Sequence, residues 1–200
     1  YEDDANVRHH RSRWAMAFYY PQDVDADMGP TAVTAHGQFH NHISNADSSQ
    51  SIEEEIKLCG PAGTVALVNF DVWHRATANI SDRSRYMLKF QFLRMEEPLE
   101  PSWDVRGIDG QPVADDPHPA LSAHLWRWLS GTSGNRPETQ PLNQSKLIAL
   151  LQSAAEPARL DAAYALSVVG GPALPDLTAA LKHENERVRG HAAFAPVSYT

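Results

Sequence analysis

The chain has 200 residues, a formal net charge of −8 and a sequence pI near 5.6. This length allows one domain of ordinary size, or one small domain with an appendage. The acidic balance argues against a nucleic-acid partner, which would favour a basic surface, and no apolar run is long enough to span a membrane as a helix. The single cysteine, Cys59, excludes an internal disulfide framework and is typical of a reducing compartment, so we expect a cytoplasmic protein.

The first half of the chain has the pattern of strands separated by polar turns. After a charged, histidine-rich start, residues 13–20 predict a strand with Trp14, Met16, Phe18 and Tyr20 on one face. Both faces of this segment are largely apolar, so we expect a central strand of a sheet. Three acids follow at alternate positions in residues 21–27, as in half of a calcium loop. The glycine and final glutamate of such a loop are missing, so a polar turn is favoured.

Three histidines after a short predicted strand at residues 31–34 have metal-like spacing: His36, His40 and His42. On a helix His36 and His40 would share one face, and His42 or another residue would supply a third zinc ligand. Neighbouring glycine and asparagine disfavour a helix, and no cysteine or carboxylate completes the set. A polar loop is therefore favoured, and a cupin-like metal binder using these three histidines stays an alternative.

Two apolar runs frame the centre of the chain. A short helix that starts at Ser51 and ends before Gly60-Pro61 is predicted, because Ser51 is a potential N-cap ahead of three glutamates. Residues 64–70 then predict a buried strand. Residues 86–92 predict a second strand, whose alternation indicates one buried face made of Tyr86, Leu88, Phe90 and Phe92.

Each of these two strands has a neighbouring residue with distinctive chemistry. His74 follows the first strand, and Arg85 opens the second, eleven residues later. If the strands pair, both side chains can point into one cavity. A neutral imidazole is a good ligand for a transition metal, and a guanidinium binds a carboxylate through two parallel hydrogen bonds. Arg75 and Arg83 are poorer candidates for the carboxylate, because only Arg85 directly abuts the apolar strand.

At these residues the chain resembles the phytanoyl-CoA dioxygenase family of iron(II)- and 2-oxoglutarate-dependent oxygenases. The similarity rests on residues 63–74, on Ser81-x-x-x-Arg85 and on residues 13–33, roughly the first half of the chain. It implies a β-rich double-stranded β-helix, a jelly-roll or cupin-like barrel. It also implies that His74 is the distal iron ligand and that Arg85 binds the far carboxylate of 2-oxoglutarate. No catalytic residue separate from the metal site is implied.

The other two iron ligands of that family, a His-x-Asp pair, do not occur in the chain. In the family the pair lies shortly before the strand that corresponds to residues 13–20, which here places it at or before Tyr1. We therefore expect a fragment of a longer oxygenase, with a barrel that is incomplete at its N-terminus. Such a fragment would be inactive by itself.

The second half of the chain changes to helical periodicity. Residues 119–129 predict a helix, and residues 130–144 have the composition of a linker. Beyond it, residues 147–165 recur at an offset of 30 as residues 177–195, which resembles short HEAT-like repeats. We thus expect three parts: the C-terminal part of an oxygenase barrel at 1–129, a linker at 130–144, and truncated HEAT-like helical repeats at 145–200.

The expected function is that of a dioxygenase that uses Fe(II) and 2-oxoglutarate to hydroxylate a small molecule, whose identity the sequence does not indicate. The repeats predict a surface for a protein partner. An alternative that is not an enzyme is a non-catalytic scaffold, in which a degenerate barrel and the repeats bind another protein.

Overall fold

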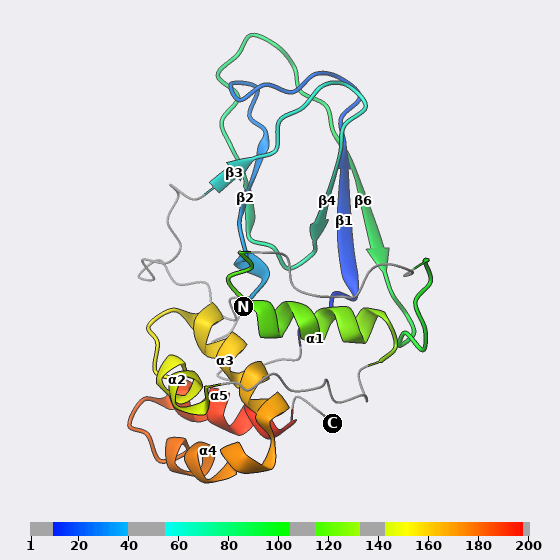
Figure 1. The fold of residues 1–200 in the computed structure, drawn as a ribbon. Helices are drawn as coiled ribbons and strands as arrows, with labels where there is room; N and C mark the ends of the chain where they lie inside the picture. The colour runs from blue at the N-terminus through cyan, green and yellow to red at the C-terminus, as the bar shows by residue number, and fades with distance from the viewer. Residues whose placement is uncertain (1–9, 40–54, 105–114, 133–142, 198–200) are drawn as a thin grey trace. The chain divides into compact units, whose positions relative to one another are not determined.

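The computed structural model describes residues 10–39, 55–104, 115–132 and 143–197 (Figure 1). The chain divides into two compact units. Residues 12–95 form the sheet unit, and the described residues among 1–11 and 96–200 form the helical unit. No helix in these described ranges combines the length and the apolar character needed to cross a bilayer.

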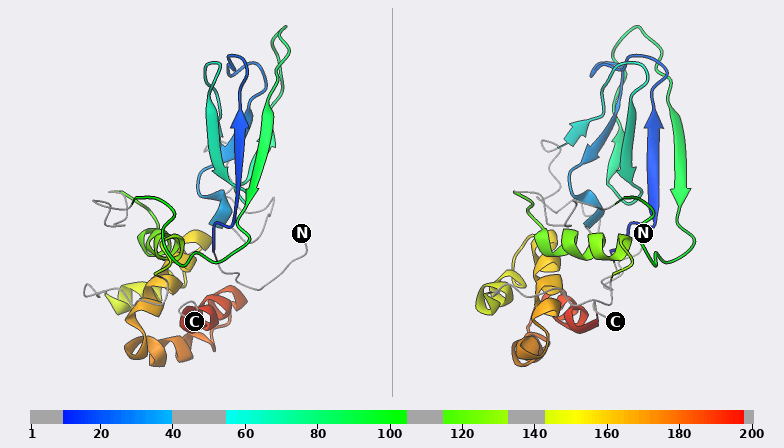
Figure 2. Two further views of the ribbon diagram at one scale, coloured as in Figure 1. Left: turned by 90° about the vertical axis from the view of Figure 1, so that its right-hand side faces the viewer. Right: turned by 45° about the vertical axis from the view of Figure 1, so that its right-hand side comes forward.

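The sheet unit contains two three-stranded antiparallel sheets. In the first sheet β1 (Trp14–Tyr19) lies between β4 (Val65–Asn69) and β6 (Leu88–Leu93), as Figures 1 and 2 show. In the second sheet β2 (Thr31–Thr34) lies between β3 (Glu55–Lys57) and β5 (His74–Ala76). A short 3-10 helix at Gly37–Phe39 follows β2.

These two sheets correct the expectation of a jelly-roll barrel. A closed barrel needs a hydrogen-bonded ladder that runs from sheet to sheet around the whole structure. In the described part of the chain, the remaining antiparallel contacts are the isolated bridges Val24–Gly60 and Met28–Asn79. The edge strands β3 and β5 of the second sheet do not pair with the edge strands β4 and β6 of the first, so the ladder does not continue from one sheet to the other.

The helix predicted between Ser51 and Gly60 is wrong for the residues that the structure describes, because Glu55–Lys57 is strand β3. Its residues pair with β2, with Ile56 opposite Val33. The local helix-start signal is thus overridden by strand pairing, a long-range interaction that short segments often follow against their own preference.

The buried cluster of the sheet unit includes one face of β1. Met16, Phe18, Tyr20 and Val24 form the buried cluster, and residues of β4 and of the flanking loops pack around it: Leu58, Ala66, Val68, Phe70 and Met87. The Tyr20 hydroxyl donates to the Leu58 carbonyl at 2.7 Å. The predicted central position of this strand is confirmed.

Strand β6 presents the opposite face to the one predicted. The four residues expected to be buried are 49% to 66% exposed: Tyr86, Leu88, Phe90 and Phe92. The register explains why, since Lys89 lies opposite Phe18 and Gln91 lies opposite Met16. Directly opposite residues share a face of the sheet, so it is the polar half of β6 that lies on the core side. In β4, Val65 and Leu67 are likewise exposed.

The helical unit contains five α-helices in the described ranges. The first is α1 (Pro119–Leu129), as predicted. Two helix pairs follow: α2 (Gln144–Leu150) with α3 (Glu156–Val169), and α4 (Leu174–Ala180) with α5 (Glu186–Val197). A 3-10 turn at Gly171–Ala173 lies between the pairs. The buried Tyr164 ring of α3 lies 4.4 Å from the His124 ring of α1 and 5.4 Å from the Phe194 ring of α5. By its contacts, α1 therefore groups with the paired helices, although the sequence-based boundary lies after it.

The internal repeat of the sequence is also a repeat of structure. The starts of the first and second helices of each pair are 30 residues apart, at 144 and 174 and at 156 and 186. An arginine in each second helix makes the same contacts. Arg159 donates to the carbonyls of Ser153 and Ala154 at 2.6 and 2.8 Å, and Arg189 donates to those of His183 and Glu184 at 2.8 and 2.7 Å. The assignment of these pairs to HEAT-like repeats stays a prediction.

This repeated contact predicts unequal costs for the same substitution. Arg159→Ala should lower the free energy of unfolding of the helical unit by about 1–3 kcal/mol. Arg159 is only 4% exposed, and its removal leaves the carbonyls of Ser153 and Ala154 without their hydrogen-bond donor. Arg189→Ala should cost less, because Arg189 is half-buried and water can replace its bonds. Denaturant titrations of both variants would check this, and equal costs would contradict it.

Candidate functional site

His74 lies on the core-facing side of the second sheet. It is the first residue of β5 and pairs with Val33 of β2. Side chains alternate along a strand, so His74 and Arg75 point to opposite faces. The His74 ring lies 6.4 Å from the Phe18 ring, which belongs to the buried cluster of the other sheet. The imidazole is therefore directed toward the space between the two sheets.

A backbone carbonyl determines which nitrogen of His74 is available. The Nδ1 atom lies 2.9 Å from the carbonyl oxygen of Val72. Since a carbonyl oxygen can only accept a hydrogen bond, Nδ1 carries the hydrogen, and in the neutral ring Nε2 then has an unshared electron pair. Metal-binding histidines commonly donate their second ring nitrogen to such an acceptor. His74 thus has the tautomer that a metal ligand requires.

Arg85 lies beside the same core cluster. Its Nη1 atom is 3.9 Å from the sulfur of Met87, and the Thr31 hydroxyl of β2 contacts that sulfur from the opposite sheet, also at 3.9 Å. Burial raises the pKa of Tyr20, and the positive charge of Arg85 opposes this rise. The half-buried Arg85 guanidinium has no carboxylate within ion-pair distance among the residues that the structure describes.

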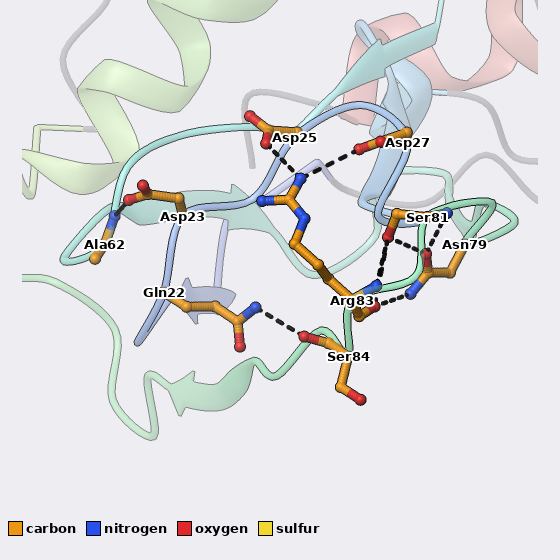
Figure 3. Close-up of polar contacts among 9 residues, drawn as sticks. All are labelled: Gln22, Asp23, Asp25, Asp27, Ala62, Asn79, Ser81, Arg83 and Ser84. Carbon is orange, nitrogen blue, oxygen red and sulfur yellow. Dashed lines mark hydrogen bonds and ion pairs between the residues drawn. The ribbon is translucent and has the colours of Figure 1, made fainter.

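The two other arginines considered for the carboxylate are already paired. Arg75 donates from Nε and Nη2 to the two carboxylate oxygens of Glu55, both at 2.7 Å. Arg83 lies 2.7 Å from Asp25 and 3.6 Å from Asp27 (Figure 3). A guanidinium held by a carboxylate of its own chain is a poor receptor for a second one. Of these three arginines, Arg85 is the one available to an anionic ligand.

The acids that resemble half of a calcium loop bind protein groups. Besides the two that pair with Arg83, Asp23 accepts a hydrogen bond from the Ala62 amide at 2.7 Å. Gln22 donates to the Ser84 carbonyl at 2.8 Å in the same group of turns (Figure 3). These contacts support the interpretation as a polar turn.

A complete metal site is not found in the described ranges. They contain no group of three histidine, cysteine or carboxylate side chains placed to hold an ion. His36 has a positive φ of 58° and stacks on Phe39 with ring centroids 6.1 Å apart, while His40 and His42 lie outside the described residues. The residues present therefore do not fit an iron centre on their own, because His74 supplies one ligand of the three that such a centre needs.

Of the two predicted site residues, His74 opens β5 and Arg85 lies three residues before β6, and each lies beside the same buried cluster. Comparisons with protein-family models, with curated proteins and with solved structures find no match. The chemistry of the site is therefore argued from its side chains.

Sequence reasoning missed one residue of this region, Lys89. Its ammonium group lies 5.7 Å from the centroid of the Phe18 ring. The alternation of β6 was visible in the sequence, but the more apolar half was taken as the buried one. Only the pairing of β6 with β1 shows that Lys89 shares the face of Phe18.

Proposed function

We propose that the sheet unit belongs to an Fe(II)- and 2-oxoglutarate-dependent dioxygenase, in which Arg85 binds the far carboxylate of 2-oxoglutarate and His74 is one iron ligand. The observation that carries this proposal is the combination of an imidazole with an available Nε2 and a guanidinium without a carboxylate partner in the described chain, both beside the cluster around Phe18. The proposed metal ligand and the proposed carboxylate-binding group then lie in one region of the sheet unit.

Each side chain has a defined role in this proposal. Arg85 would fix the cosubstrate by two parallel hydrogen bonds to its carboxylate, a geometry that a lysine cannot reproduce. The Val72 carbonyl would keep the His74 ring oriented. His74 is exposed and Arg85 is half-buried, so water reaches both side chains and screens both interactions in part. The metal would supply the oxidising chemistry, and its remaining ligands would come from outside the described residues.

The role of Arg85 can be tested by measuring 2-oxoglutarate binding to the 200-residue chain by calorimetry. Arg85→Ala should weaken the affinity about tenfold or more, because a charge-assisted interaction in a partly buried site is lost. Arg85→Lys should retain part of it. Arg75→Ala is the matched control and should leave the affinity unchanged, since Arg75 is paired with Glu55.

An equal loss in the Arg75 and Arg85 variants would show that general positive charge, and not this site, binds the diacid. The role of His74 has its own readout. Added Mn²⁺ should broaden the NMR signals of the His74 ring before those of His183, which belongs to the helical unit. Broadening of His183 first, or of both rings equally, would contradict the assignment of His74.

A further inference from the structure

The first sheet has an apolar face on the side away from the buried cluster. In the register, Ala17 of β1 lies between Leu67 of β4 and Phe90 of β6, so the three side chains share this side. Alternate residues of the three strands continue the outer face in both directions and complete a set of eight: Val65, Leu67, Ala15, Ala17, Tyr19, Leu88, Phe90 and Phe92. None of these residues is charged.

The large side chains of this outer face are in contact with solvent in a single chain. Those of the edge strands β4 and β6 are 49% to 71% exposed: Val65, Leu67, Leu88, Phe90 and Phe92. Single exposed apolar residues are common on proteins, but a contiguous apolar patch usually marks an interaction surface. The polar Asn69 lies opposite Ala15 at one end of the face, and an apolar centre with polar residues at its margin is typical of protein–protein interfaces.

The other parts of this chain do not offer a matching apolar surface. In the described helical unit the large apolar side chains that are exposed are spread over residues 96–104 and α4: Leu99, Trp103, Leu174 and Leu181. The segments that the structure does not describe contain no phenylalanine or tryptophan and only scattered aliphatic residues. The surface that matches the outer face in size and character is therefore the same face of a second copy.

The exposed area is sufficient for such a pairing. From their exposed fractions, the five large side chains present on the order of 500 Å² of apolar surface in each copy. Two copies therefore bury on the order of 1,000 Å² before the margin is counted, which is about the minimum for a specific interface. Two antiparallel sheets also pack face to face readily, at about 10 Å, through their apolar sides.

We infer that the outer face of the first sheet is the interface through which two copies of this chain form a symmetric dimer. In a two-fold dimer both copies use the same residues, so every contact of Phe90 or Leu67 occurs twice. The buried cluster beside His74 and Arg85 lies on the other side of the sheet. The dimer is therefore independent of the proposed function.

Sedimentation equilibrium of the 200-residue chain between about 1 and 200 μM tests this inference. The mass should rise with concentration from 22.1 kDa to twice that value. Phe90→Glu and Leu67→Glu should each raise the dissociation constant about 100-fold or more, because each places two charges in an apolar interface. Ile80→Glu is the matched control and should leave the dissociation constant unchanged, since Ile80 is exposed in the same unit but lies outside the three strands.

A second measurement uses the wild type alone, so it does not depend on whether a variant folds. In a mixture of ¹³C-labelled and unlabelled chains, nuclear Overhauser effects between copies should arise from the side chains of the outer face. In a separate chain Phe90 borders water, so its replacement should affect association far more than the folding of the sheet unit.

Three results would overturn the inference. The first is a chain that stays monomeric over the whole concentration range. The second is an equal loss of association in Ile80→Glu and Phe90→Glu, or contacts between copies that arise only from the helical unit. The third is growth beyond the dimer, which would indicate pairing along the open edge of β6 and not through the face of the sheet.

Discussion

Replacing Phe18 by alanine should lower the free energy of unfolding of the sheet unit by about 3–5 kcal/mol. Phe18 is 1% exposed and lies at the centre of the cluster that also contains Met16 and Tyr20. Its ring contacts His74 of the second sheet and Lys89 of the first. The substitution therefore removes apolar contacts on both sides and leaves a cavity that a rigid pair of sheets fills only partly.

Phe90→Ala is the matched control for this prediction. Phe90 lies opposite Ala17 on the neighbouring strand, one residue out of step with Phe18, and so points to the other face of the same sheet. Because Phe90 is 49% exposed, its loss should cost less than about 1 kcal/mol. Hydrogen exchange of the β1 amides at increasing denaturant measures both values within the sheet unit. Equal costs would show that the outer face of this sheet is also covered in the folded protein.

Asp161→Asn should stabilise the helical unit at pH 7, by at most about 3 kcal/mol. The Asp161 carboxylate in α3 accepts a hydrogen bond from the Leu121 amide of α1 at 3.0 Å. Burial raises the pKa of Asp161 to about 6, and backbone hydrogen bonds from Leu121 and Ala120 oppose this rise only in part. Asparagine keeps a hydrogen-bond acceptor at this position without the cost of a buried charge.

The pH dependence gives the sign of this effect. The folded state binds the proton of Asp161 more tightly than the unfolded state, whose aspartate has a pKa near 3.8. The contribution of Asp161 to stability is therefore fully present below about pH 4 and is lost as the pH rises through 6. Urea titrations of the wild type and of Asp161→Asn should agree near pH 4 and diverge by pH 7. Burial lowers the pKa of His191, so the contribution of His191 makes the helical unit more stable as the pH rises. This contribution is the same in the wild type and in Asp161→Asn and cancels in the comparison.

A destabilising effect of Asp161→Asn that is constant from pH 4 to pH 7 would contradict this prediction. It would show that the ionised carboxylate is a favourable partner for the first turn of α1. The His118 side chain at the start of α1 makes no capping hydrogen bond, so the Asp161 contact would take the place of a local cap. The difference between the two pH profiles shows whether the ionised Asp161 carboxylate destabilises or stabilises the folded helical unit.

Local patterns in the sequence were sufficient for much of the secondary structure. The alternation in residues 13–20 predicted β1, and its two apolar faces predicted its central place in the sheet. The helical periodicity predicted α1 and the repeat that relates the two helix pairs. These features are local, because they depend on the side-chain period of a single element or on the recurrence of a segment. The roles of His74 as a metal ligand and of Arg85 as the carboxylate-binding group were predicted from the residue types and the family resemblance, and they stay predictions.

The sequence by itself determined, through the period of its apolar side chains, which segments form strands such as β1 and which form helices such as α1. Only the tertiary structure decided which side of each strand faces the core, because burial depends on the partner against which a strand packs. The register of β6 against β1 places Lys89 opposite Phe18, and it reverses the expectation for Phe90 and Phe92. The same long-range pairing makes Glu55–Lys57 a strand and leaves two separate sheets in place of a barrel. A side-chain period of two identifies the two faces of a strand but cannot say which of them is the inside.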